Sequence, residues 1–137
     1  MTGVQTCALP ICKVTSVKEG AVNGIVTIDV NGTAVTATIS MDSIKNLGVE
    51  AGKEATAFVK ATEVMVAVGE LKISARNQFA GKVAKVEAGA VNSIVTIEAP
   101  VGTIAATISN AAVAELGLEA GKEATAVIKA TSVMIGC

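Results

Sequence analysis

The chain has 137 residues, of which 51% are hydrophobic but only 1% aromatic, and it carries a net charge of −1 without any histidine. The lack of histidine excludes a His-based catalytic triad and the usual Cys/His zinc site. A near-neutral chain with two aromatic residues is also unsuited to nucleic-acid binding, which uses basic surfaces and stacking side chains. We therefore expect neither an enzyme nor a nucleic-acid partner.

The apolar residues are mostly Val, Ile, Leu and Ala. Such small side chains bury little area each, so we expect extensive contacts between subunits. The longest uncharged run, residues 99–114, contains Pro, Thr, Ser and Asn and falls short of the roughly 20 apolar residues that a membrane-spanning helix needs. The N-terminus also lacks the pattern of a secretory signal. We expect a cytoplasmic protein with no membrane segment.

The chain contains one sequence twice. KVTSVKEGAVNGIVTI (13–28) recurs as KVAKVEAGAVNSIVTI (82–97), and LGVEAGKEATAFVKATEVM (47–65) recurs as LGLEAGKEATAVIKATSVM (116–134). The match needs no gap and covers most of each half, so it predicts a tandem duplication of one small fold. We place the two domains at residues 13–69 and 70–137.

Most of each copy has the alternation of apolar and polar residues that is typical of β-strands. In the first copy this pattern covers residues 25–30, 33–40 and 53–60. The residues that we expect on the inward faces of these strands are Val26, Ile28, Val30, Val35, Ala37, Ile39, Ala55, Ala57 and Val59.

A short helix is predicted between the last two of these strands. Ser40 suits the N-cap, Ile44 and Leu47 are three residues apart, and Gly48 can end the helix with a positive φ. Each copy then has about five strands and one short helix. Short strands that must cover their edges favour a small barrel of the oligonucleotide/oligosaccharide-binding (OB) type, so we expect an all-β fold of two tandem OB-like barrels.

Three motifs occur in order in the second copy: SARNQFAGKV (74–83), GAVNSIVTIE (89–98) and LGLEAGKEATAVIKATSVM (116–134). Together they resemble the molybdate-binding Mop domain, a TOBE-like unit, and the two copies resemble the di-Mop form of molbindins. The resemblance covers residues 71–136 and, in the first copy, 13–68. It implies small β-barrels assembled as homotrimers, and a cytoplasmic role in storing molybdate, or tungstate, for molybdenum homeostasis.

The residue types in these motifs suit a tetrahedral dianion, which needs several donors converging from different directions. Ser74 supplies a hydroxyl and Arg76 a rigid fork of N–H donors. A lysine ammonium stands next to a small alanine, which lets an anion approach the main-chain N–H, at two corresponding places: Lys129–Ala130 and Lys60–Ala61.

The resemblance implies an inter-domain oxyanion site, with Ser74, Ala75, Arg76, Lys129 and Ala130 on one side. Hydroxyls at a helix start of a neighbouring domain would complete it, since unpaired N–H groups there attract anions. In the first copy these are Ser40 and Ser43. In the second copy they are Ser109 and the position of Ala112, which has no hydroxyl, so a site completed by that copy should be weaker.

A second kind of site is implied near the three-fold axis of the family's assemblies, where the GAVN turns supply main-chain donors. The residues concerned are Gly20, Val22, Asn23, Gly89, Val91 and Asn92. None of the implied ligands coordinates a metal cation, so molybdate or tungstate is the one expected cofactor.

Other interpretations stay open. Taken singly, Lys60 and Lys129 resemble edge-strand lysines that discourage aggregation, and GAVN resembles an ordinary turn. At the level of function, the alternatives are a stand-alone molybdate-sensing module and a carrier of molybdopterin. The chain has no P-loop, and its two phenylalanines offer little for a pterin ring to stack on.

Residues 1–12 break the duplication. MTGVQTCALPIC matches its counterpart, ELKISARNQFAG (70–81), at no position, whereas identity begins abruptly at Lys13. Because gradual divergence does not usually stop at a sharp edge, we interpret residues 1–12 as a foreign N-terminal segment, similar to a translated sequencing adapter fused to a reading frame.

The altered segment has two expected consequences. The first copy lacks counterparts of Ser74 and Arg76, so the chain should bind fewer anions strongly than one with SARN in both halves. Pro10 has no N–H, which should weaken the pairing of the first strand. The three cysteines, which have no metal-ligand spacing and which we interpret as incidental, are Cys7, Cys12 and Cys137.

Overall fold

The structure, a computed structural model, describes residues 6–8, 12–69 and 72–136. The first half of the chain contributes β1 (Thr6–Ala8), β2 (Cys12–Lys18), β3 (Asn23–Val30), β4 (Thr33–Ser40), α1 (Met41–Leu47), β5 (Glu54–Lys60), the 3₁₀ turn η1 (Ala61–Glu63) and β6 (Met65–Ala67). The second half contributes β7 (Asn77–Ala88), β8 (Asn92–Ala99), β9 (Gly102–Ser109), α2 (Asn110–Leu116), β10 (Glu123–Ile128), the 3₁₀ turn η2 (Ala130–Ser132) and β11 (Val133–Gly136).

The predicted strands and their inward faces are confirmed. Residues expected inside on β3 and β5 are buried, as are the first two of the three on β4, while Ile39 is half-buried near the end of that strand. Alternation puts every second side chain on one face, so these small apolar residues form a continuous layer. Together with their counterparts in the second copy they make one core that runs through both halves of the molecule.

The helix α1 has the predicted caps, and α2 is capped in the same way. The Ser40 hydroxyl accepts a hydrogen bond from the N–H of Ser43 at 3.1 Å, and Gly48 ends α1 with a φ of 65°. In α2 the Ser109 hydroxyl accepts from the N–H of Ala112 at 3.1 Å, and Gly117 ends the helix with a φ of 62°. Each cap satisfies main-chain groups that a seven-residue helix cannot pair internally.

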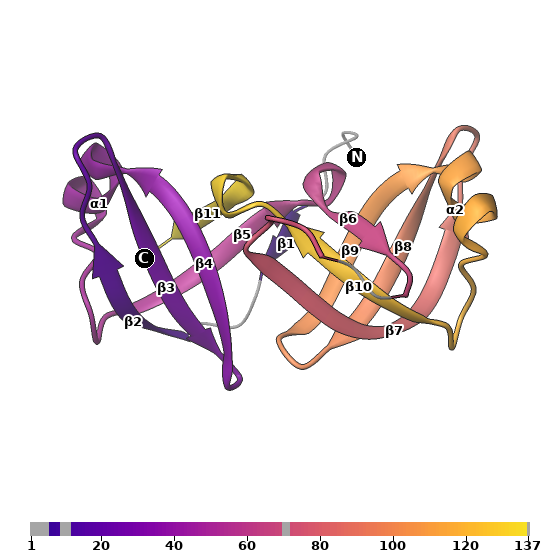
Figure 1. Ribbon diagram of the computed structural model, residues 1–137, viewed down its shortest axis with the longest axis horizontal. Coiled ribbons are helices and arrows are strands. Elements are labelled where there is room, and N and C mark those ends of the chain that lie inside the picture. Colours follow the sequence, from indigo (N-terminus) through magenta and orange to yellow (C-terminus); the bar gives the residue numbers. More distant parts are fainter. Residues whose placement is uncertain (1–5, 9–11, 70–71, 137) are drawn as a thin grey trace.

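Two antiparallel sheets stand side by side along the long axis of the molecule, each curved like part of a barrel (Figure 1). The first has the strand order β1-β5-β2-β3-β4, and the second has the order β6-β10-β7-β8-β9. A register shift interrupts β2 between Val14 and Ser16, and the same shift recurs in β7 between Val83 and Lys85. Such irregularities increase the local twist that curls a small sheet.

The two copies exchange their last strands. β11, from the end of the second copy, pairs with β5 of the first, with Val133 opposite Val59. β6, from the end of the first copy, pairs with β10 of the second, with Met65 opposite Val127. The boundary predicted at residue 69 therefore separates the two copies along the sequence. In space, however, each sheet contains strands from both copies.

The opening strands of the two copies differ. In the second copy β7 runs in one register along β10, from Asn77 opposite Ile128 to Lys82 opposite Glu123. In the first copy β1 places Ala8 opposite Phe58, whereas β2 places Cys12 opposite Ala55, so the register shifts by one residue between them. The pairing expected to be weak at Pro10 lies outside the described residues.

Candidate functional site

A cleft of about 310 Å³ opens near the start of β7. We call it the central cleft, and its lining residues are Met65, Ile73, Ser74, Ala75, Arg76, Lys129, Ala130 and Thr131. Two segments that are more than 50 residues apart in the sequence thus meet here: the loop before β7 and the turn after β10. The five residues that were expected on one side of an oxyanion site all line this cleft.

The strand ladder explains why these segments meet. Asn77 lies opposite Ile128, the last pair of β7 and β10, so the residues just before Asn77 and just after Ile128 leave the sheet at the same place. Lys129 then occupies the N-cap position of η2, and no side chain caps that turn. The N–H groups at the start of the turn therefore resemble those at a helix N-terminus, which are left without intrahelical acceptors.

The loop before β7 also presents main-chain donors. Within residues 6–8, 12–69 and 72–136, no group accepts a hydrogen bond from the N–H of Ser74, Ala75 or Arg76. Main-chain N–H groups that lack an acceptor in the protein remain available to a ligand. Because all three residues line the central cleft, an anion in the cleft is a suitable acceptor.

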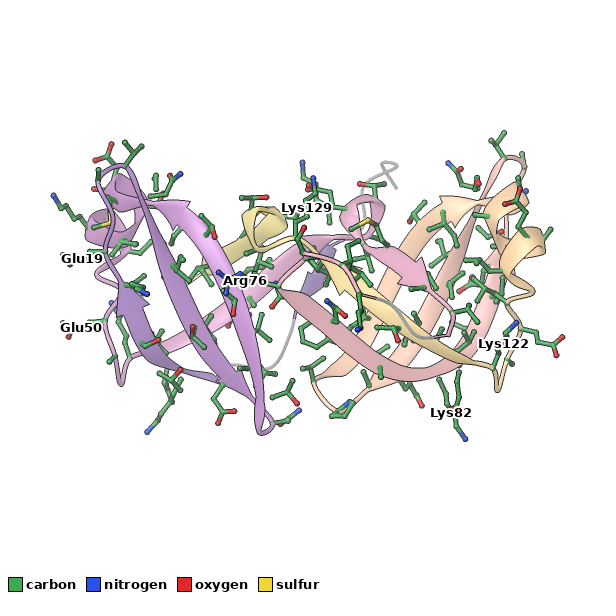
Figure 2. The ribbon with its side chains drawn as sticks, in the orientation of Figure 1. Glu19, Glu50, Arg76, Lys82, Lys122 and Lys129 are labelled. Atoms are coloured by element: carbon green, nitrogen blue, oxygen red, sulfur yellow. The ribbon has the colours of Figure 1, made fainter. Side chains whose placement is uncertain are left out.

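The charge of the central cleft is positive. Arg76 and Lys129 are exposed, and Figure 2 shows both near the middle of the molecule, whereas Lys82 and Lys122 lie toward one end. Among the described residues the one ion pair is Lys85–Glu87, at 3.1 Å, so no carboxylate in the described part of the chain pairs with either cleft cation. Two cations at one concave surface attract small anions.

A second cleft, of about 360 Å³, lies next to the first. It is lined by Ser40, Ser43 and Leu47 around the start of α1, by Thr38 and Ile39 of β4, and by Thr131, Val133, Met134 and Ile135 from the second copy. We call it the helix-side cleft. The Ser40 hydroxyl donates to that of Ser43 at 2.9 Å. The two expected serines thus stand beside the central cleft, and Thr131 lines both clefts.

The remaining candidates of the oxyanion site lie in neither cleft. Lys60 is exposed at the end of β5, where it stands opposite Thr6 of β1. Ala61 is fully buried in η1, and Ser109 caps α2. The strand that accompanies Lys60 is thus β1, whose sequence lacks the serine and arginine of the second copy.

The GAVN turns connect β2 to β3 and β7 to β8, beside α1 and α2 at the two far ends of the molecule (Figure 1). Val22 and Val91 are 74% and 72% exposed, while their carbonyls accept hydrogen bonds from the N–H groups of Met41 and Asn110. A Cβ on Gly20 would lie 2.3 Å from the carbonyl oxygen of Asn23, so this glycine is required by the turn itself. The same applies to Gly89, at 2.7 Å from the oxygen of Asn92.

Sequence reasoning missed two residues that hold the loop before β7 in place. Asn77 is 1% exposed, and its side-chain amide binds the main chain of Thr36 in the first copy. The Gln78 amide donates to the carbonyls of Ala75, at 3.0 Å, and Ile73, at 3.3 Å. Both belong to the SARNQ stretch, but nothing in a single sequence distinguishes a buried anchor from a ligand.

Neither a metal site nor a membrane-spanning helix is found in the described part of the chain. It contains no group of three or more His, Cys, Asp or Glu residues that is arranged to hold a metal ion. Its two α-helices have seven residues each, and neither is long enough to cross a bilayer.

The fold and the central cleft define a class of protein: a tandem pair of small β-barrels with an anion-attracting cleft where the copies meet. The chain belongs to the TOBE domain family, which matches residues 11–66 and 73–135. The predicted resemblance to Mop proteins and the predicted fold class are both confirmed by the relatives that follow.

The chain is 60% identical over 67 residues to a probable molybdenum-pterin-binding protein of Haemophilus influenzae, which covers 48% of this chain and 97% of that protein. It is 37% identical over 128 residues to the molybdenum-pterin-binding protein MopA of Rhodobacter capsulatus, covering 90% of this chain and 48% of MopA. The chain therefore spans about half the length of MopA.

Among solved structures, the chain is similar to a crystal structure of the cytoplasmic molybdate-binding protein ModG with molybdate bound. The TM-score is 0.90 at 40% sequence identity, over 95% of this chain and 94% of that one. Because nearly all of both chains superimpose, the likeness covers both barrels and the region where they meet, which we call the seam.

Proposed function

We propose that this chain binds molybdate, or tungstate, as an oxyanion in the central cleft. The observation that carries the proposal is the coincidence in one cleft of two cations, Arg76 and Lys129, with three main-chain N–H groups. Among the described residues the cations have no carboxylate partner and the N–H groups have no acceptor. Such a set of donors matches the needs of a tetrahedral dianion. The molybdate-bound relative and the molybdenum-related names of the others support the choice of ligand.

Six of the eight residues that line the central cleft have a proposed role. Arg76 and Lys129 supply charge, the Ser74 hydroxyl supplies a neutral donor, and Ala75 and Ala130 leave room for the anion to reach the main chain. The hydroxyl of Thr131, which the sequence reasoning did not single out, is a further donor at the same wall. We propose Ser40 and Ser43 as an adjoining part of the site, reached through the helix-side cleft.

We further propose that the two copies contribute unequally. Thr6, Cys7 and Ala8 remain in the ladder with β5, whereas Ser74–Arg76 precede the ladder of β7 and leave their N–H groups available. Lys60 and Ala61 therefore form at most a weak site, and Ser109 one that lacks the second hydroxyl. The expected result is one strongly bound anion at this kind of site per chain.

The alternative ligand is a molybdopterin, since several relatives are named for pterin binding. A pterin ring favours aromatic or extended polar walls, and no aromatic side chain lines the central cleft. We therefore favour the free oxyanion, and with it a binding protein for molybdenum storage or homeostasis over an enzyme. A stand-alone sensing module would use the same site.

For the assembled protein we propose a cytoplasmic homotrimer. The exposed valines of the GAVN turns, Val22 and Val91, are suited to contacts between chains, because apolar side chains at turn tips gain from burial. Gly20, Asn23, Gly89 and Asn92 would then supply a second kind of anion site between chains. Native mass spectrometry with and without molybdate measures both the subunit number and the anions retained.

The function is tested by isothermal titration calorimetry with sodium molybdate, sodium tungstate and a molybdopterin, each also in the presence of excess sulfate. Binding of the two oxyanions that sulfate does not displace supports the proposal. Tight binding of the pterin alone would assign the chain to the carriers, and no heat with any ligand at millimolar concentration would refute the proposal.

A further inference from the structure

The loop that carries Ser74–Arg76 is held at two points by the two residues that follow it. The first point is Asn77, which begins β7 and is fixed to the first copy by two hydrogen bonds of 2.8 Å to Thr36. The second point is Gln78, whose side chain folds back along the loop and donates to the carbonyls of Ile73 and Ala75. The two residues have different environments, since Asn77 is buried and Gln78 is exposed.

The bonds of Gln78 determine where the loop's main-chain donors point. In a trans peptide unit the C=O of one residue and the N–H of the next point in opposite directions, and the peptide bonds here are trans. Holding the carbonyls of Ile73 and Ala75 toward Gln78 therefore turns the N–H groups of Ser74 and Arg76 away from it. These are two of the N–H groups that have no acceptor within the described part of the chain.

We propose that Gln78 is a positioning residue of the central cleft: it orients the main-chain N–H groups of Ser74 and Arg76 for the anion without touching the anion itself. The inference rests on the proposed oxyanion function and assigns to it a residue outside the cleft lining. Without Gln78 the loop would sample other peptide orientations, and binding would have to order it. The free energy needed to order the loop lowers the affinity for the ligand.

The test uses Gln78→Met, which keeps an unbranched side chain of similar length but cannot donate to the two carbonyls. The matched control is Thr15→Val, which removes an exposed side-chain bond to a main-chain carbonyl, that of Thr27, far along the sequence from the cleft. Molybdate affinity is measured by calorimetry. We expect roughly a 3- to 10-fold loss for Gln78→Met, as for one or two net hydrogen bonds, and a change below twofold for Thr15→Val.

A second readout separates positioning from general damage. In amide NMR spectra of the unaltered chain, molybdate should shift the N–H resonances of Ser74 and Arg76 together with those of Ala130 and Thr131. In Gln78→Met the shifts of the first pair should shrink while those of the second pair persist. The midpoint of thermal unfolding without ligand should stay unchanged, because the Gln78 side chain is exposed.

The outcomes are distinguishable. If the unaltered chain binds no molybdate, the proposed function is wrong and this inference falls with it. If the unaltered chain binds and Arg76→Met weakens binding, but Gln78→Met binds within twofold and shows full shifts at Ser74 and Arg76, the function stands and the positioning role is refuted. An equal loss of shifts on both sides of the cleft would also overturn it.

Discussion

The side-chain amide of Asn77 binds the main chain of Thr36 through both of its polar atoms. Its oxygen accepts from the Thr36 N–H and its nitrogen donates to the Thr36 carbonyl, each at 2.8 Å. The amide thus pairs with β4 as one residue of an added strand would, and it covers part of an edge that would otherwise be unpaired. This contact ties the residue next to Arg76 to the other copy.

Asn77→Ala should therefore destabilise the whole chain. Removing the amide leaves the N–H and C=O of Thr36 without partners, and we expect a loss of about 1–3 kcal/mol in the free energy of unfolding. Urea denaturation followed by circular dichroism measures it. The control is Asn46→Ala on the exposed side of α1, expected within about 0.5 kcal/mol of the parent. Equal stability of the two variants would contradict the anchoring role.

Replacing either cation of the central cleft should weaken molybdate binding far more than replacing Lys60, the first-copy counterpart of Lys129. Arg76→Met and Lys129→Met each remove a charge that lines the cleft, and we expect roughly 10- to 100-fold weaker molybdate binding, as for charge-assisted hydrogen bonds. Lys60→Met is the matched control, at the position that corresponds to Lys129, and should change affinity less than twofold. Calorimetric titration decides. A loss at Lys60 as large as at Lys129 would show that the first copy holds an equivalent site.

The residues at the start of α2 form a polar pair, whereas the corresponding residues at the start of α1 are Gly and Met. In the second copy the Ser93 hydroxyl donates to the side-chain oxygen of Asn110, whose amide nitrogen donates to the Gly89 carbonyl at 3.0 Å. At the corresponding place in the first copy are Gly24 and Met41, and a Cβ on Gly24 would lie 2.4 Å from the side chain of Ile44.

Ser93 and Asn110 should consequently be coupled. Ser93→Gly and Asn110→Met each break this part-buried polar pair, and each should cost about 1–2 kcal/mol of unfolding free energy. The double variant reproduces the first-copy combination, so its cost should fall short of the sum by about 0.5–3 kcal/mol. Urea denaturation of the parent, the two single variants and the double variant gives the four free energies of this double-mutant cycle. Strict additivity would mean that the two side chains act independently.

Strand exchange makes a prediction about the separated copies. Residues 70–137 alone would leave the edge of β10 that pairs with β6 unoccupied, and β11 without β5. We expect this half to form a dimer in which each chain donates β11 to the other, since the two exchanged strands occupy corresponding positions. Light scattering after size-exclusion chromatography measures the mass. A stable, cooperatively unfolding monomer at micromolar concentration would count against the exchange.

Local sequence patterns were sufficient for three strands and the helix of the first copy, but not for the grouping of residues in the central cleft. Alternation of apolar residues predicted β3, β4 and β5, and the Ser40 and Gly48 caps of α1 followed from the preferences of single residues. The pairing of Ser74–Arg76 with Lys129 came from the family resemblance, and the structure brings these residues into one cleft. Their binding role stays a prediction.

The tertiary structure alone decided which copy each last strand joins. Because the duplicated sequences are so similar, Val64–Val66 and Val133–Ile135 offer nearly the same side chains to β5 and β10, and no local pattern favours pairing within a copy over exchange. The role of Asn77 was equally hidden, since its partner Thr36 becomes its neighbour only when the barrels pack together. Composition and periodicity thus determined the barrels, while contacts between distant segments determined the seam at which the anion is proposed to bind.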